Sequence, residues 1–330
     1  MDLSYLKGKS VLVTGGTGTV GSFCVRQLLE KSEARRVIVF SRDEFKQLNM
    51  SIEFKQYEDR LRFFLGDVRD VGRLNRAFHG VDYVIHTAAL KHVHILEYNP
   101  FEAVQTNIIG TQNVVNAAID QKVEKLLLIS TDKSANPTSL YGATKLCAEK
   151  LTIGGNFYGS PGTKFSAVRF GNIFGSRGSF VGLIKEQQKK GIVHLTHEEM
   201  TRFWISVPQC VVFIFDVLKN MHGGEIFVPK IPSMKVKDFI LAFAPDCKIE
   251  VVGIRPGEKI HEILLTPEEA RHALEFSDKY IIFPEHKDIS KIDKYTDGEK
   301  IKDNFIYISN ENENWIDKES VRIMVTVENF

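Results

Sequence analysis

Tyr141 and Lys145 are the pair of residues in this sequence whose types and spacing most directly suggest chemistry. They lie four positions apart in "YGATK", so a helix would place both on one face and bring the ammonium beside the phenol. A neighbouring positive charge lowers the pKa of a tyrosine, and the phenolate can then accept a proton from an alcohol as hydride leaves the carbon. Thr131 ends the run "KLLLIST" and can hydrogen-bond the same hydroxyl group. Together these residues predict the oxidation of an alcohol.

Asp132 and Lys133 follow Thr131 directly, in "STDKSANP", although alcohol oxidation does not require them. They could supply one further acid and one further base. A free lysine is charged at neutral pH, so Lys133 can act as a base only if its pKa is depressed. Burial, the neighbouring Lys145 and the positive ring of an oxidised nicotinamide would each lower that pKa. The alternative is a simple ion pair between Lys133 and Asp132 or a surface carboxylate.

A glycine-rich turn near the start of the chain predicts a dinucleotide site. Gly15, Gly18 and Gly21 stand in "VTGGTGTVG", between a predicted strand and a predicted helix. Glycine lets the backbone approach a pyrophosphate closely, and the helix N-terminus holds the negative charge. The alternative, a glycine-rich turn without a ligand, fits this context less well. The turn lacks the GK[ST] of a phosphate-binding P-loop, which excludes a nucleoside triphosphatase of that type.

The end of the second predicted strand, "VFSRDEFK", indicates which dinucleotide binds. An NAD enzyme places an acidic residue there against the ribose 2′-hydroxyl, whereas Arg42 and Lys46 suit a 2′-phosphate, so the sequence favours NADP. Asp43 argues for NAD, although it falls slightly late to reach the ribose, and a surface Arg–Asp pair is the alternative. Asp67 follows the third strand, where a carboxylate commonly meets the adenine amino group. The full predicted cofactor set is Gly15, Thr17, Gly18, Thr19, Val20, Gly21, Ser41, Arg42, Lys46, Asp67, Val68, Thr87, Lys91, Tyr141 and Lys145.

The elements that must position these residues alternate along the chain. Nearly continuous apolar runs, typical of parallel strands covered on both faces, occur at 10–15, 36–41, 61–67, 81–89, 125–131 and 165–170. Amphipathic stretches between them, such as 100–120 and 140–158, provide crossover helices. We expect a Rossmann-like, doubly wound α/β fold with a parallel sheet.

A smaller mixed α/β lobe should complete the molecule. Residues 225–229 return to the sheet as a late strand, because 207–221 looks like one more crossover helix. We therefore expect an NADP-binding domain of residues 1–172 plus 207–229. A discontinuous substrate lobe would contain residues 173–206 plus 230–330.

Composition excludes several other classes. The chain has 43 basic and 42 acidic residues and a pI near 7.7, which gives no electrostatic case for nucleic acid or a membrane surface. The four cysteines show no CxxC spacing and suggest thiols in a reducing, cytoplasmic compartment. The first strand begins too early for a signal peptide, and the longest apolar run, "CVVFIF", is too short to span a bilayer.

Several segments resemble the extended short-chain dehydrogenase/reductases that act on nucleotide sugars: "TGGTGTVG", "YGATK" and "RFGNIFGSRGS". More narrowly, "SRDEFKQ", "AALKHV", "STDKSANP", "MTRFW", "MHGGEIFVPKIPSMK" and "GIRPGEK" resemble the inverting UDP-N-acetylglucosamine 4,6-dehydratases. The resemblance extends from about residue 10 to residue 265. It implies an NADP-dependent lyase that opens pseudaminic acid-type sugar biosynthesis. The expected product is UDP-2-acetamido-2,6-dideoxy-β-L-arabino-hexos-4-ulose.

This resemblance gives Asp132 and Lys133 a task. Oxidation at C4 of a hexose acidifies the C5 hydrogen, so a base can remove it while an acid helps the C6 hydroxyl leave as water, and hydride then returns to C6. Lys133 would take the C5 proton, and Lys133 or Tyr141 would return a proton on the opposite face. Retaining hexose dehydratases of related type have Asp-Glu where this chain has Asp132-Lys133. A retaining dehydratase, a UDP-sugar 4-epimerase or reductase, and a non-catalytic NADP sensor are the alternatives; the sensor predicts loss of the Tyr–Lys pair.

The same resemblance implies a substrate site and an assembly. The residues expected to line the UDP-GlcNAc site are Lys91, Asn172, Val181, Thr196, Arg202, Arg255 and Glu258, with Arg202 and Arg255 as forks for the diphosphate. Helices 100–120 and 140–158 would form the surface of a homo-oligomer, a dimer or a hexamer. His86, His92 and His94 have no matching carboxylate or cysteine spacing, so we expect structural histidines and no metal site.

Overall fold

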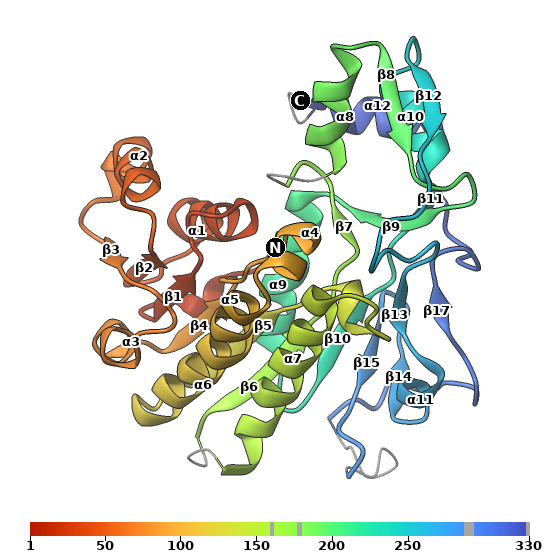
Figure 1. The fold of residues 1–330 in the computed structure, drawn as a ribbon. Coiled ribbons are helices and arrows are strands. Elements are labelled where there is room, and N and C mark those ends of the chain that lie inside the picture. The colour runs from red at the N-terminus through yellow and green to blue at the C-terminus, as the bar shows by residue number, and fades with distance from the viewer. Residues whose placement is uncertain (159–161, 177–179, 287–293, 328–330) are drawn as a thin grey trace.

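A mixed sheet of ten strands forms the centre of the structure, a computed structural model that describes residues 1–158, 162–176, 180–286 and 294–327. Its order across the described residues is β16-β14-β15-β10-β6-β5-β4-β1-β2-β3 (Figure 1). The strands of the parallel part are β1 (Ser10–Thr14), β2 (Arg36–Ser41), β3 (Leu61–Leu65), β4 (Tyr83–His86), β5 (Lys125–Ile129), β6 (Lys164–Val168) and β10 (Ile226–Pro229). All seven strands expected from the sequence are present. They are short and apolar because both faces of this sheet are covered.

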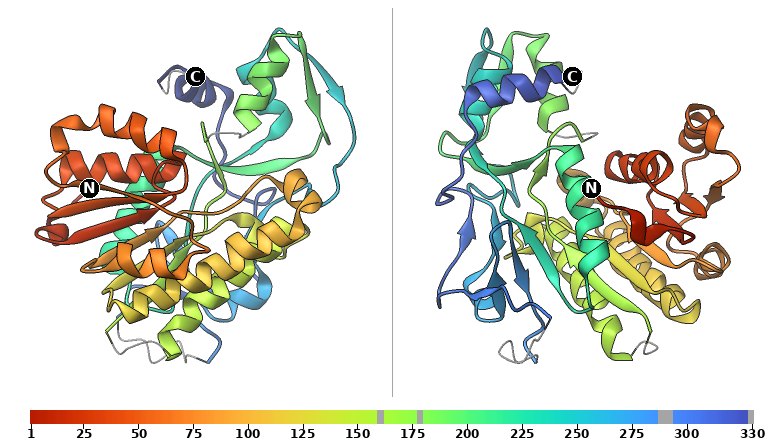
Figure 2. Two further views of the ribbon diagram at one scale, coloured as in Figure 1. Left: turned by 60° about the vertical axis from the view of Figure 1, so that its left-hand side comes forward. Right: turned by 180° about the vertical axis from the view of Figure 1, so that it is seen from behind.

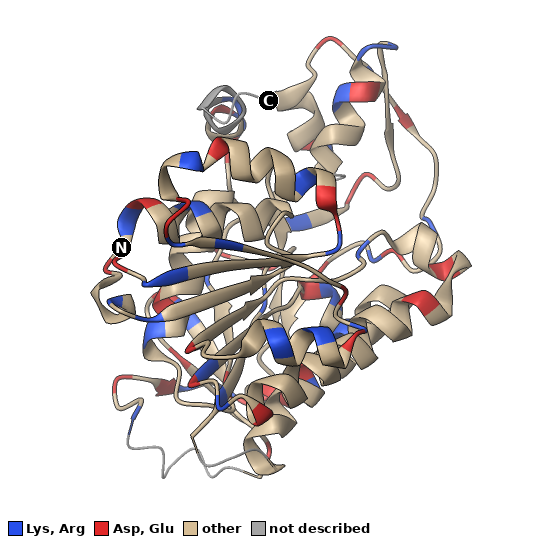
Figure 3. Ribbon diagram, turned by 90° about the vertical axis from the view of Figure 1, so that its left-hand side faces the viewer, with Lys and Arg blue, Asp and Glu red and all other residues tan. Residues whose placement is uncertain are grey.

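Helices cover the two faces of the parallel strands, which confirms the doubly wound α/β fold (Figure 2). On one face α1 packs beside α9, and on the other α6 lies between α3 and α7. The helices of this part are α1 (Thr19–Lys31), α2 (Glu44–Glu53), α3 (Val71–Phe78), α4 (Val93–Tyr98), α5 (Pro100–Ala103), α6 (Gly110–Asp120), α7 (Leu140–Tyr158) and α9 (Val207–Asn220). A π-helical turn, Val104–Ile109, joins α5 to α6. Most of the Lys, Arg, Asp and Glu positions lie on the helices and loops around the sheet, with a few on the strands (Figure 3).

The C-terminal segment extends the main sheet, contrary to the expectation that residues 230–330 belong wholly to the second lobe. Strand β15 (Lys279–Ile282) pairs antiparallel with β10, and β14 (Ala273–Glu275) and β16 (Glu299–Lys300) follow. An edge strand leaves backbone donors and acceptors unpaired, and β15 satisfies those of β10. Residues 287–293, between β15 and β16, lie outside the described part of the chain.

The smaller lobe has its own core of aromatic and aliphatic side chains. Trp204 and Phe239 stack with ring centroids 4.4 Å apart, and Phe174 packs edge-on against both. Its strands are β7 (Asn172–Ile173), β8 (Ile192–Leu195), β9 (Thr201–Ile205), β11 (Ser233–Lys235) and β12 (Lys248–Val251). Its helices are α8 (Phe180–Gln188), α10 (Val236–Phe243) and α12 (Lys318–Val327). A separate pair, β13 (Ile263–Leu265) with β17 (Tyr307–Ile308), and the short helix α11 (Pro267–Ala270) lie beside the main sheet.

A buried ion-pair group ties the C-terminal segment to the sheet. Arg169, which follows β6 and is fully buried, donates to both carboxylate oxygens of Glu149 on α7 and of Glu269 on α11. The guanidinium also donates to the Leu264 carbonyl oxygen. Such a group fixes the relative positions of the segments it joins, because losing one partner leaves a buried charge uncompensated.

None of the described helices combines the length and the hydropathy needed to cross a membrane.

Candidate active site

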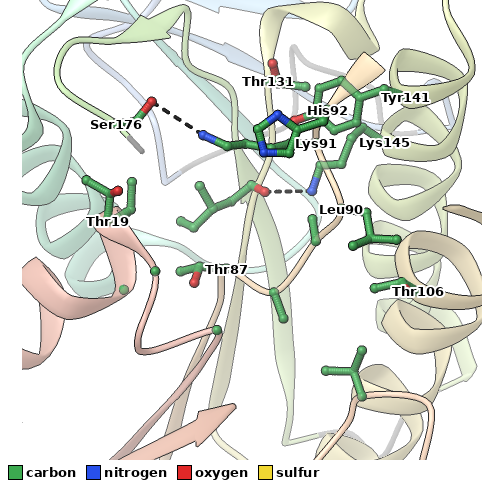
Figure 4. A pocket seen from close by; sticks show the side chains of 18 of the residues that line it. Thr19, Thr87, Leu90, Lys91, His92, Thr106, Thr131, Tyr141, Lys145 and Ser176 are labelled. Atoms are coloured by element: carbon green, nitrogen blue, oxygen red, sulfur yellow. Dashed lines mark hydrogen bonds between the residues drawn. The ribbon is translucent and has the colours of Figure 1, made fainter. Parts of the chain in front are cut away.

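A pocket of about 900 Å³ opens where the strand order reverses between β1 and β4. Ligands of doubly wound folds bind at this switch point, beyond the carboxyl ends of the strands. Every residue of the predicted cofactor set lines it, from Gly15 to Lys145. Figure 4 labels five of them: Thr19, Thr87, Lys91, Tyr141 and Lys145. They converge because the carboxyl ends of adjacent parallel strands meet at one edge of the sheet. The volume lies within the range of small-molecule and cofactor sites.

The glycine-rich turn is shaped by close backbone contacts. Gly15 has φ +66°, and a Cβ there would lie 2.8 Å from the Ala88 amide nitrogen, so another residue would be strained and would collide. Gly18 donates to the Gly15 carbonyl and precedes α1, so the helix N-terminus faces the pocket. This geometry fits a dinucleotide pyrophosphate.

Arg42 and Asp43 have different surroundings at the end of β2. Arg42 is half exposed, and its Nη1 lies 3.5 Å from Asp67 Oδ2. Asp43 caps α2 by accepting from the Lys46 amide, and its carboxylate also pairs with the Lys46 ammonium at 2.6 Å. Asp43 is therefore engaged in helix capping. Both Arg42, paired with Asp67, and Lys46, paired with Asp43, are cations of the pocket wall near Ser41.

The loop after β4 brings Lys91 to the opposite wall. Asn107, in the π-helical turn, donates to the Leu90 carbonyl and accepts from the Leu90 amide, which pins the loop to the helix. Lys91 Nζ lies 3.5 Å from Ser176 Oγ of the smaller lobe. Burial and the nearby Lys133 charge lower the pKa of Lys91. The last residues of "RFGNIFGSRGS", 177–179, lie outside the described residues.

Tyr141 and Lys145 share one face of α7 and line the pocket with Thr131 (Figure 4). Lys145 Nζ donates to the Ile129 carbonyl, and burial lowers the pKa of Lys145 to about 8. The expected depression of the Tyr141 pKa is absent: burial raises it to about 12 against the opposing charge of Lys133. Desolvation of a phenolate outweighs a single nearby cation here.

Lys133 also lines the pocket, but its electrostatics differ from the expectation. Its Nζ lies 3.0 Å from Asp132 Oδ1 and 3.4 Å from Glu262 Oε1. Burial opposes the charge of Lys133, yet the two carboxylates outweigh burial and raise its pKa above the usual value. The expected lowering of the Lys133 pKa is therefore wrong for this arrangement, in which Lys133 is an ammonium ion.

Asp132 does not face the pocket, although the sequence placed it there together with Lys133. It is fully buried in a single 3-10 turn, Asp132–Ser134, whose first amide donates to the Phe170 carbonyl. Its Oδ1 accepts from the hydroxyl of Thr131, 2.9 Å away, and from Lys133. Burial raises the pKa of Asp132. Asp132 reaches the pocket only through these two neighbours.

Gly142 explains how the Asp132–Ser134 turn packs so closely against α7. A Cβ at Gly142 would lie 2.2 Å from the Lys133 carbonyl oxygen. The glycine of "YGATK" therefore lets the backbone of Lys133 rest directly on the helix that carries Tyr141 and Lys145.

The predicted substrate residues are dispersed. Lys91 and Asn172 line the pocket, whereas Val181 is buried in the core of the smaller lobe and the Thr196 hydroxyl contacts Met200. Arg255 is exposed, and its amide donates to the Glu258 carboxylate. The roles of these residues in substrate binding stay predictions.

Arg202 differs from the free diphosphate fork that the sequence suggested. It is nearly buried and donates to the carbonyl oxygens of Thr201, Lys259 and Ile260. Its Nε lies 3.6 Å from Glu262. Backbone acceptors thus occupy its guanidinium, which fixes the segment leading to Glu262.

Glu262, which lies outside the pocket wall but 3.4 Å from Lys133, was not predicted from the sequence. Its only local signal is a glutamate directly before the apolar run "ILL", which does not distinguish a surface charge from a buried one.

Among the histidines, His86 is buried between the hydroxyls of Thr14 and Thr111, a structural role. The described residues contain no group of side chains suited to hold a metal ion.

A doubly wound sheet with a glycine-rich turn and a Tyr–Lys pair beside the pocket defines an extended short-chain dehydrogenase/reductase. Within that class, the chain belongs to the polysaccharide biosynthesis protein family, which matches residues 11–284. It is 44% identical to a UDP-N-acetylglucosamine 4,6-dehydratase (inverting) of Campylobacter jejuni, over 98% of this chain and 99% of that one. It is 37% identical to a UDP-glucose 4-epimerase of Rickettsia conorii, over 88% of both chains.

Solved structures agree with this placement. Pen from Bacillus thuringiensis is 38% identical and superimposes with a TM-score of 0.90, covering 98% of this chain and 99% of that chain. DesIV from Streptomyces venezuelae, a dTDP-glucose 4,6-dehydratase solved with NAD and TYD bound, is 25% identical with a TM-score of 0.68. That match covers 76% of this chain and 86% of the other.

Proposed function

We propose that this protein is an NADP-dependent UDP-N-acetylglucosamine 4,6-dehydratase that inverts C5. The observation that carries the proposal is Lys133 in the wall of the pocket that also presents Thr131, Tyr141 and Lys145. A simple alcohol dehydrogenase or epimerase has no use for this additional lysine and its buried acid. The close similarity to an enzyme named for this inverting reaction supports the same conclusion.

The chain's own groups divide the work as follows. Gly15, Gly18 and Arg42 in the pocket wall would hold NADP, whose chemistry would be reversible hydride transfer with the sugar carbons C4 and C6. Burial raises the pKa of Tyr141 to about 12, and the positive ring of a bound oxidised nicotinamide would oppose that effect and favour the phenolate. As a phenolate, Tyr141 would take the proton of the C4 hydroxyl, to which Thr131 hydrogen-bonds, and Lys145 lies on the same helix face. Lys133 then removes the C5 proton, which the C4 ketone has acidified. Protonation of C5 from the opposite face, with Lys133 or Tyr141 as the donor, gives the L-arabino configuration.

Asp132 and Lys133 must be an acid and an amine at the moment of elimination. A proton moved from the ammonium to the carboxylate, across 3.0 Å, produces both without changing the net charge of the pair. The burial that raises the pKa of Asp132 supports such a transfer, because burial favours neutral groups. The Thr131 hydroxyl, 2.9 Å from Asp132, lies between this carboxyl group and the pocket, where it can pass the proton to the departing C6 hydroxyl.

NADP rather than NAD is part of the proposal. Its support is Arg42, the cation beside Ser41 in the pocket wall, together with the engagement of Asp43 in capping α2. A nucleotide sugar would occupy the part of the pocket between the two lobes, near Lys91 and Asn172. Its product would enter pseudaminic acid-type sugar biosynthesis.

We also propose a cytoplasmic homo-oligomer. The four free cysteines support a reducing compartment. Exposed apolar side chains on the α5–α7 surface, Phe101, Ile109 and Phe157, support association of copies through this face. Light scattering of the purified protein would report its mass, and a monomer at micromolar concentration would contradict the association.

The deciding experiment is incubation with UDP-GlcNAc in D₂O, without added coenzyme, followed by NMR. We expect a 4-keto-6-deoxy sugar with deuterium at C5 and the L-arabino configuration. A D-xylo product would show retention of configuration. A C4 epimer as the sole product would contradict the dehydratase proposal and support an epimerase, the activity for which one similar protein, a UDP-glucose 4-epimerase, is named.

A further inference from the structure

Lys133 has a second carboxylate partner that the proposed reaction does not use. Glu262 is 2% exposed and stands directly before β13, far along the chain from Lys133. Its Oε1 lies 3.4 Å from Lys133 Nζ, while Asp132 holds the same ammonium at 3.0 Å. The lysine is thus held between two buried carboxylates, one that follows β5 and one that directly precedes β13.

The position of Glu262 is fixed independently of Lys133. Its amide donates to the Ser309 hydroxyl, and its carbonyl accepts from the Ser309 amide. Arg202, itself fixed by three carbonyl oxygens, lies 3.6 Å from Oε1, and Lys259 lies 4.0 Å from Oε2. Burial opposes the charge of Glu262, but the three surrounding cations outweigh burial and lower its pKa. Glu262 is therefore a rigidly placed negative charge.

We propose that Glu262 is the positioning residue of the elimination step. It holds the Lys133 side chain at the pocket wall. It also sets the pH range in which the Asp132–Lys133 pair shares a single titratable proton, as the elimination requires. This inference rests on the proposed function, because it assigns Lys133 to the C5 proton. Glu262 acts through Lys133, because it does not line the pocket.

The direction of the effect follows from the charges that face Lys133. These groups are Asp132, Glu262, Arg202, Lys91, Lys259 and Tyr141. A negative charge close to the pair favours retention of protons, so its removal makes every proton loss from the pair easier. An opposite charge within 4–6 Å shifts a pKa by roughly 1–3 units. Removing the charge of Glu262 should therefore move the pH–rate profile to lower pH by about one unit or more.

The test is the pH dependence of kcat for UDP-GlcNAc dehydration in wild type and E262Q, with E250Q as the matched control. Glu250 is a half-exposed glutamate of β12 that pairs with Lys248 on the surface. We expect the E262Q profile to move to lower pH and the E250Q profile to coincide with wild type. A uniform loss of rate in E262Q, with an unmoved profile, would show a merely structural role and overturn the proposal.

A second measurement does not depend on activity. Competitive acetylation of Lys133 as a function of pH, read by peptide mass spectrometry, reports the fraction of free amine. We expect a larger fraction of free Lys133 amine at a given pH in E262Q than in wild type. E262D keeps the negative charge, so its acetylation should be close to that of wild type. E262D also provides a test if E262Q folds poorly. Equal acetylation in wild type and E262Q would refute the proposal. The wild-type protein could show the expected acetylation of Lys133 and yet form no 4-keto-6-deoxy product from UDP-GlcNAc. That result would contradict the proposed function but not the effect of Glu262 on Lys133.

Discussion

Replacement of Arg42 by alanine tests the cofactor preference. Arg42 is 53% exposed and lies 3.5 Å from Asp67, within the pocket wall at the end of β2. NADP carries a 2′-phosphate that NAD lacks, so a cation at this place should affect only NADP. We expect wild type to bind NADP more tightly than NAD, and R42A to lose most of that difference.

The magnitude follows from the exposure of the side chain. A hydrogen bond to a charged group contributes roughly 1.5–3 kcal/mol, and half exposure places Arg42 at the low end of that range. Binding the phosphate also weakens the Asp67 pair, a loss of about 0–1 kcal/mol. The net value, about 1 kcal/mol or slightly more, corresponds to a five- to tenfold rise in Kd for NADP. The Kd for NAD should change less than about twofold.

Calorimetric titration of protein stripped of nucleotide, with NADPH and NADH at low and moderate salt, measures these constants. The NADPH value should weaken with salt in wild type more than in R42A, because ions screen an exposed charge. Arg36, exposed at the opposite end of β2, provides the matched control R36A, which should bind both nucleotides as wild type does. Two results would refute the reasoning: a lower Kd of wild type for NADH than for NADPH, or an equal rise of both Kd values in R42A.

Three further predictions concern catalysis and stability. Y141F should lower kcat about 100-fold or more, because it removes the proton acceptor, while NADPH titration shows an unchanged Kd. In wild type, the free energy of unfolding should rise between pH 8 and pH 10.5, because native Lys145, with a pKa of about 8, binds fewer protons there than an unfolded lysine. Urea unfolding of K145M should show a rise that is smaller by on the order of 3 kcal/mol, because Lys125, with a pKa of about 8, still contributes to it. R169M should lower the free energy of unfolding by about 3–5 kcal/mol in the same assay, because it leaves Glu149 buried without its partner.

Each of these predictions has a contrary outcome. Near wild-type turnover by Y141F would assign the C4 proton to another group. Equal pH dependence of unfolding in wild type and K145M would show that native Lys145 is charged above pH 8. A loss below about 1 kcal/mol in R169M would mean that solvent reaches Glu149. The double variant R169M/E149M, which removes both charges, should recover part of the stability.

Local patterns in the sequence were sufficient for most of the fold. Each parallel strand is a short apolar run, and each crossover helix has its own amphipathic period, so neither needs knowledge of distant contacts. Residues after successive strands, such as Gly15, Arg42, Thr87 and Thr131, could be assigned to one pocket because parallel strands end at one edge of the sheet. The addition of β14–β16 to that sheet could not be assigned, since pairing at an open edge depends on which segment folds back to it.

The sequence by itself determined which groups are available for chemistry: a Tyr–Lys pair, a threonine and an adjacent Asp–Lys pair. Only the tertiary structure decided their charge states and directions. It turned Asp132 inward, brought Glu262 to Lys133 from a distant segment, and engaged Arg202 with backbone carbonyls. A pKa depends on burial and on every charge within a few ångströms, and for Lys133 the distant residues Glu262 and Arg202 add to the effect of its neighbour Asp132.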